Sequence, residues 1–206
     1  MRFFSVVDLF SDNFAADLAR STVALLVVVD PLGTIPLYIA LTQKMERVQR
    51  RAVSKTIIIT ATSLLFAFAL AGSQIFAVFG ITIASFMIAG GVLLFIVAVE
   101  LLTHGGWRFG DASTKEDAGI VPLAFPLLAG PGAITAVIIS LETSGLVATA
   151  VSILITTGVT YLTLRYSDGI YRVLGRRGSL IVTRVFAVFV AAIAVQFVVQ
   201  GVQEIF

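Results

Sequence analysis

Residues 29–36 read VDPLGTIP and interrupt an apolar stretch of the chain near its middle. Residues 129–135, AGPGAIT, interrupt a second apolar stretch in the same way, and an offset of 100 positions places Pro31 on Pro131. Proline lacks an N–H and clashes with the preceding turn, and glycine has little helical preference, so both segments are expected to be discontinuous helices. Such paired interruptions in the two halves of a membrane protein indicate the binding site of a transporter.

The composition independently indicates a membrane protein. The 206 residues are 58% hydrophobic and only 13% charged, with a mean hydropathy of +1.04, whereas soluble domains carry roughly 25% charged residues. The chain has no cysteine and one histidine, His104. Disulfides, thiolate metal sites and histidine metal clusters within one chain are therefore excluded, and no cofactor is expected.

A membrane-spanning helix needs about 20 mainly apolar residues. On this basis we expect an all-α membrane protein with a single transmembrane domain over residues 1–206. One repeat covers about 18–102 and a second about 121–204, joined by a linker at 103–120. The six expected spans are 18–42, 56–76, 81–102, 121–141, 146–166 and 180–204.

The distribution of basic residues predicts the orientation. The loops after the first, third and fifth spans hold five, two and four of the 14 Lys and Arg residues, and cytoplasmic loops carry the excess. Both termini are thus expected outside, in a multi-pass protein of the inner (cytoplasmic) membrane. Since each half has three spans, the halves become inverted-topology repeats, with helices 1 and 4 broken at their Pro/Gly motifs.

Asp30 is the acid within the first break. An aspartate at a helix centre costs roughly 2.5–3.5 kcal/mol on insertion scales, so it requires a partner or a role. Asp30 followed by Pro31 is typical of a helix N-cap and first helical residue. The carboxylate can cap freed N–H groups, or it can bind a proton, a cation such as sodium, or a substrate ammonium, and these uses are compatible. If Asp30 is the coupling group, we expect it to be buried, where desolvation disfavours the charged carboxylate.

The second break has Gly130 at the corresponding cap position. It leaves bare N–H groups at the positive end of a helix, which is a ready site for a carboxylate. A carboxylate in one half and N–H donors in the other would suit a zwitterion. Thr34 and Thr135 flank the breaks and either bind a ligand or return to a carbonyl of the preceding turn. The candidate substrate-binding residues are Asp30, Pro31, Gly33, Thr34, Gly130, Pro131, Gly132 and Thr135.

Four segments carry a family resemblance over nearly the whole chain. They are VVVDPLGTIPLYIALT and FMIAGGVLLF in the first half, and PLAFPLLAGPGAITAVI and AAIAVQFVVQG in the second. Together they resemble the MarC family of bacterial and archaeal inner-membrane proteins. The resemblance implies a transporter of small neutral amino acids such as alanine or glycine. The residues that match the first signature are Asp30, Pro31, Gly33 and Thr34, and those that match the second are Gly130, Pro131 and Gly132.

We therefore expect a secondary transporter, an exporter or exchanger, in contact with membrane lipid and coupled to protons or sodium. The alternatives are transport of another small solute or a drug-like compound, or a non-transporting membrane assembly protein. An enzyme is disfavoured because the spans hold few reactive groups. No nucleic-acid partner is expected, and the chain is compatible with a homo-oligomer. Residues 81–102 carry a small-residue face, including Gly90 and Gly91, that predicts close helix packing.

Overall fold

The computed structural model describes residues 14–42, 45–104 and 122–205, apart from the side chains of residues 168–177 and 179–180. Throughout these ranges the regular structure is helical, as the sequence predicts. The elements are α1 (Phe14–Val29), α2 (Thr34–Thr42), α3 (Arg47–Phe79), α4 (Ile83–His104), the π-helical turn η3 (Leu123–Leu128) and α6 (Pro131–Ile205).

Four helical segments are long and apolar enough to cross a membrane, namely Arg47–Phe79, Ile83–Thr103, Pro131–Ser167 and Ile181–Ile205. The pair α1 and α2, bent by 46° at the first break, makes a fifth if it is counted as one span. The predicted span 121–141 is interrupted at its Pro/Gly motif, as expected, because η3 ends at Leu128 and α6 begins at Pro131. Over the residues that the structure describes, the molecule is thus all-helical, with four to five candidate membrane spans.

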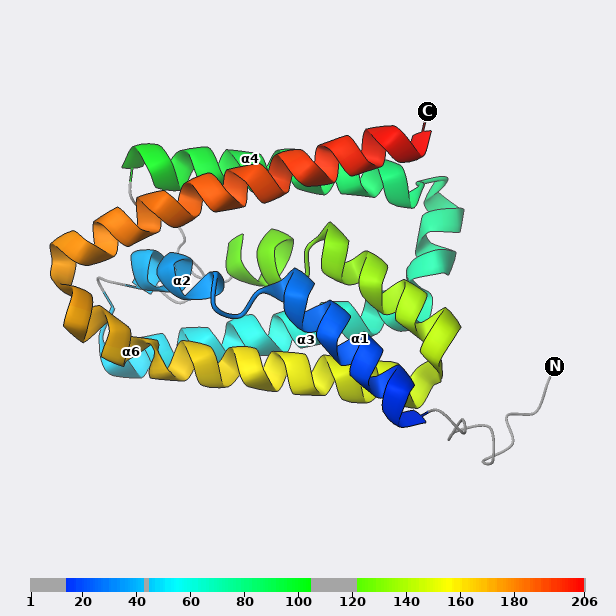
Figure 1. Cartoon of the computed structure of the whole chain (residues 1–206), viewed down its shortest axis with the longest axis horizontal. Coiled ribbons are helices and arrows are strands. Elements are labelled where there is room, and N and C mark those ends of the chain that lie inside the picture. The colour runs from blue at the N-terminus through cyan, green and yellow to red at the C-terminus, as the bar shows by residue number, and fades with distance from the viewer. Residues whose placement is uncertain (1–13, 43–44, 105–121, 206) are drawn as a thin grey trace.

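The long helices run along the long axis of the molecule (Figure 1). The start of α1, the link from α3 to α4 and the last turn of α6 lie toward one end, and α2 extends toward the other. The chain of α6 folds back twice along this axis, first near Gly145, which has a φ of +77°. A left-handed residue cannot continue a right-handed helix, so this glycine redirects the chain.

Local chemistry determines both ends of α3. The Glu46 N–H donates to the Gln49 side chain over 3.1 Å at the start of α3. The helix ends at Gly80, which adopts the left-handed conformation with a φ of +62° and closes the C-terminal turn. Residues 47–79 therefore form one helix, and Gly80 provides the tight turn into α4.

Small residues let α4 approach α6 closely. A Cβ added to Gly91 would lie 2.7 Å from the Ala194 carbonyl oxygen, and one added to Gly201 would lie 2.6 Å from the Ala84 carbonyl oxygen. Gly90 faces Pro131 in the same way. The predicted close packing is confirmed, and it holds the start of α6 against the middle of α4.

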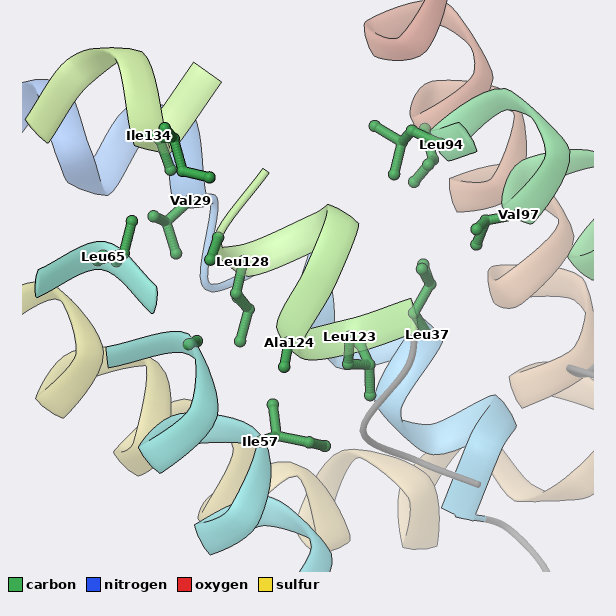
Figure 2. Packing of buried hydrophobic residues seen from close by; sticks show 14 of the residues in the cluster. Val29, Leu37, Ile57, Leu65, Leu94, Val97, Leu123, Ala124, Leu128 and Ile134 are labelled. Atoms are coloured by element: carbon green, nitrogen blue, oxygen red, sulfur yellow. The ribbon is translucent and has the colours of Figure 1, made fainter. Parts of the chain in front are cut away.

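The two broken pairs form the centre of the core (Figure 2). Leu123, Leu128 and Ile134, from both sides of the second break, are at most 2% exposed. They share one cluster with Val29 of α1, Leu37 of α2 and residues of α3 and α4. Many large apolar side chains on the outer faces of the helices are exposed, which suits a surface that meets lipid.

Candidate functional site

The first break is formed by the backbone conformation of Asp30. Its φ of +43° is left-handed, a conformation that aspartate and asparagine tolerate better than most residues. The Asp30 N–H completes α1 by donating to the Leu26 carbonyl over 3.1 Å, and the Thr34 N–H donates to the Asp30 carbonyl over 3.2 Å. One left-handed residue and the turn at 31–33 thus separate the two half-helices.

The Asp30 carboxylate caps the turn that leads into α2. Its Oδ1 accepts the Gly33 N–H over 3.0 Å, and a Cβ at Gly33 would collide with this carboxylate. The Thr34 hydroxyl donates to the carbonyls of Asp30 and Pro31, over 2.9 and 3.1 Å. Groups within the first break therefore satisfy much of its hydrogen bonding. The Thr34 hydroxyl bonds to carbonyls of the preceding turn, which is one of the two uses expected for it.

Asp30 is exposed, so the expectation that it would be buried is wrong. The reason is geometric: the left-handed turn projects Asp30 and Leu32, which is 70% exposed, away from the core. Pro31 and Thr34 are buried in its place. The carboxylate consequently lies where an aqueous or solute-filled cavity can reach it.

The second break is built from a different set of bonds. Phe125, which precedes Pro126, is extended with φ and ψ of −142° and 135°, as expected before a proline. The Ala129 N–H donates to the Ala124 carbonyl over 2.9 Å, and the Ile134 N–H donates to the Gly130 carbonyl over 2.9 Å. A Cβ at Gly130 would collide with the Pro126 carbonyl oxygen, so this position requires glycine.

The start of α6 offers hydrogen-bond donors. Pro131 has no N–H, and the Ile134 N–H makes the first bond along the helix. The N–H groups of Gly132 and Ala133 precede that bond, and the first N–H groups of a helix have no intrahelical acceptor. They lie at the positive end of the helix dipole. The second break therefore keeps donors available, whereas the first break caps itself.

Both breaks converge on one cavity of about 260 Å³. Asp30, Gly33 and Thr34 line it from the first break, and Gly130 and Gly132 line it from the second. A Cβ built on Gly132 would lie 2.9 Å from Val28 Cγ1, so the two breaks are in close contact. The remaining wall is apolar, formed by residues of α1, α4, η3 and α6: Val28, Val29, Leu94, Leu127, Ala133, Phe186, Phe189, Val190, Ile193 and Phe197.

Three predicted site residues do not line this cavity. Pro31 is buried and its carbonyl accepts the Thr34 hydroxyl. Pro131 packs against Gly90 of α4. Thr135 has a buried hydroxyl without a hydrogen-bond partner among the described residues. The two prolines shape the breaks, and Thr135 lies one turn further along α6.

Sequence reasoning missed the aromatic wall of the cavity. Phe186, Val190, Ile193 and Phe197 come from the last segment of α6 and line one side, with Phe189 beside them. Their spacing of three to four residues is that of one helix face. This periodic stripe was a usable signal, but a stripe of this kind in a membrane span more often faces lipid or another helix.

A second, more polar cavity of about 350 Å³ follows the seam between α1 and the first part of α6. A chain of hydroxyls borders it, in which Ser140 Oγ donates to Ser21 Oγ over 2.8 Å and Ser21 Oγ donates to Ser144 Oγ over 3.1 Å. Asp17 and Arg20 also line it. Along both helices it continues from the cavity at the breaks toward the start of α1.

Similarity to known proteins agrees with this architecture. The family model described as "MarC family integral membrane protein" matches residues 16–206. This chain belongs to the MarC family. It is 38% identical to a UPF0056 membrane protein of Archaeoglobus fulgidus over 194 residues, covering 89% of this chain and 91% of the relative. It is 30% identical to the UPF0056 membrane protein YhcE of Escherichia coli over 199 residues, covering 89% and 91% of the two chains. No solved structure matches.

The family membership confirms the resemblance that the four sequence segments carried. It makes this MarC family protein an integral membrane protein, and the names of its relatives specify no solute. Among the described residues, no group of three or more His, Cys, Asp or Glu side chains is placed to hold a metal ion. The cavity presents one carboxylate, backbone N–H donors and aromatic faces.

Proposed function

We propose that this MarC family protein is a secondary transporter that exports or exchanges small neutral amino acids such as alanine and glycine. The observation that carries the proposal is the convergence of two broken helices on one cavity. Irregular backbone at membrane depth is tolerated only where it is buried in protein or lines a water-filled cavity. Discontinuous helices whose ends face a common site are typical of secondary transporters.

The charges around the cavity favour a zwitterion. Asp30 supplies a negative group that an ammonium can approach, and the nearby rings of Phe186 and Phe189 add favourable faces for a cation. The N–H groups of Gly132 and Ala133, at the positive end of α6, suit a carboxylate. An amino acid carries both groups on one carbon, and a cavity flanked by both partners can hold both ends.

The size of the cavity favours a small solute. Pockets for drug-sized ligands run from about 300 to 1,000 Å³, and the cavity at the breaks measures about 260 Å³. The apolar wall leaves room for a hydrogen or methyl side chain and offers no partner for a charged one. A drug-like compound is therefore the weaker alternative as a substrate. A role as a non-transporting assembly protein does not account for the cavity.

The six-span topology with inverted repeats belongs to the same proposal. In each half, a broken helix precedes two long helical segments: α1 and α2 precede α3 and α4, while η3 and the start of α6 precede its two later segments. With the basic loops in the cytoplasm, both termini lie outside. Asp30 then stands at the meeting point of the repeats, where its exposure to the cavity lets a proton or sodium ion reach the carboxylate and couple to transport.

Transport by reconstituted protein tests the proposal. Proteoliposomes preloaded with alanine should take up labelled alanine by counterflow, and unlabelled glycine should compete while phenylalanine should not. Gly132→Leu should abolish uptake, because its Cβ already lies 2.7 Å from Phe197 Cζ and the rest of the side chain fills the cavity. The atoms nearest to this Cβ belong to the side chains of Phe197 and Val28 and not to the backbone. These side chains can move aside, so the variant should still fold.

Gly158→Leu is the matched control. Gly158 lies on α6 as well, and a Cβ there would meet nothing within 4 Å, so uptake should remain at the wild-type level. Equal uptake by the two leucine variants would remove the cavity from the mechanism. Counterflow of a labelled drug-like compound, in the absence of any alanine counterflow, would favour the alternative solute class.

A further inference from the structure

A third cavity, of about 230 Å³, lies where α2, α3 and α6 meet, away from the helix breaks. Its polar lining comprises Arg50, Arg51 and Ser54 of α3, Arg165 and Tyr166 of α6, and Tyr38 of α2. No Asp or Glu belongs to this lining within the part of the chain that the structure describes. Three arginines thus line one polar cavity, and the described part of its wall contains no carboxylate.

Arg50 connects this cavity to the first broken helix. Its Nε donates to the Thr42 carbonyl at the end of α2 over 3.0 Å. The Tyr38 hydroxyl donates to the Arg50 carbonyl over 2.8 Å, and Tyr38 is only 3% exposed. These two bonds fasten α2 to α3 in both directions. Arg50 of the cavity lining is therefore bonded directly to the second half of the broken helix.

The other two arginines are available to a ligand. Arg51 and Arg165 are both exposed, and neither has an ion pair with any described residue. Arg50 and Arg51 also lie near the first turn of α3, where the helix dipole is already positive and cations are disfavoured. Among the described residues that line the cavity, no carboxylate offsets this positive charge. A guanidinium fork matches the oxygens of a phosphate group in a bidentate manner.

We propose that this cavity is a binding site for a phosphate group carried by an anionic lipid headgroup or by free inorganic phosphate. The cavity lies at the end of the molecule toward which α2 extends, which the basic loops assign to the cytoplasm. The cytoplasmic leaflet is anionic, and basic pockets between helices bind lipid headgroups there. Tyr166, 72% exposed at the cavity, is typical of an interfacial aromatic residue.

Thermal unfolding of the purified full chain in detergent measures this binding. Phosphatidylglycerol is titrated in one arm, inorganic phosphate in a second, and phosphatidylcholine in a third as the neutral comparison. Each cationic side chain near anionic headgroups contributes about fivefold in affinity. The double variant Arg51→Gln/Arg165→Gln should therefore bind about 25-fold more weakly. Arg47→Gln, exposed on the same helix but outside the cavity lining, should stay within about twofold of wild type.

The arms separate the two sources of the phosphate group. A saturable rise in melting temperature with phosphatidylglycerol alone supports a lipid headgroup, and the same rise with inorganic phosphate supports a free anion. If the double variant does not fold, each single variant should show about a fivefold loss. A wild-type protein that responds to neither anion, or variants that respond as wild type does, would overturn the site.

Discussion

Replacing Asp30 by asparagine, alanine or glycine separates its role as a cap from its role as a charge. The carboxylate accepts the Gly33 N–H over 3.0 Å, and the residue itself is left-handed with a φ of +43°. Asparagine can keep the cap and tolerates this conformation, but it carries no charge. Alanine loses both the cap and the conformational tolerance, and glycine loses only the cap.

The expected changes in the free energy of unfolding follow from these two features. Loss of the cap costs about 1 kcal/mol on substitution by alanine, and the left-handed conformation costs alanine about 1 kcal/mol more. Asp30→Ala should therefore destabilise the protein by about 2 kcal/mol. Asp30→Asn should change stability by less than about 0.5 kcal/mol, and Asp30→Gly by a similar small amount, because glycine avoids the conformational cost.

The effect of each variant on alanine transport should depend on the charge at residue 30 and not on the change in the free energy of unfolding. A hydrogen bond to a charged group is worth about 1.5–3 kcal/mol, so Asp30→Asn should raise the half-saturating alanine concentration roughly 10- to 100-fold. Because asparagine cannot titrate, counterflow at high alanine should persist while accumulation driven by a proton or sodium gradient should be lost. Asp30→Gly should behave as Asp30→Asn does in both transport assays.

Counterflow and gradient-driven uptake are measured side by side in proteoliposomes, with thermal unfolding in detergent as the measure of stability. Wild-type behaviour of Asp30→Asn in both transport assays would refute a role for the charge and leave Asp30 as a structural cap. Loss of stability in Asp30→Asn, to the level of Asp30→Ala, would refute the account of the break itself.

Three further outcomes are expected. Gly130→Ala should give protein that fails to run as one peak in detergent, because its Cβ collides with the backbone oxygen of Pro126; a monodisperse variant would contradict the described break. Single cysteines are introduced at Ser11 and Gln49 in a chain that has none. An impermeant thiol reagent on intact cells should label only position 11, and labelling at position 49 alone would contradict the proposed orientation. Tyr38→Phe should lower stability by about 1 kcal/mol in thermal unfolding, since it removes a hydrogen bond of 2.8 Å; an unchanged melting temperature would contradict this.

Local sequence determined much of the helical architecture. The end of α3 at Gly80 and the breaks at residues 30–33 and 129–130 could be predicted, because each depends on the backbone preferences of a few adjacent residues. The apolar composition predicted a lipid environment in the same way. Gly90 and Gly91 also predicted close packing correctly, since a missing Cβ permits contact with whichever helix lies opposite.

Only the tertiary structure brought distant residues together. The convergence of Asp30 with Gly130 and Gly132 on one cavity depends on packing across about 100 residues of chain. The exposure of Asp30 and the aromatic wall from Phe186 to Phe197 depend on it too. In lipid, an apolar helix face has no preference between a neighbouring helix and the acyl chains, so its partner is decided by the detailed fit of surfaces. That fit involves residues from several helices at once, and no single stretch of the chain encodes it.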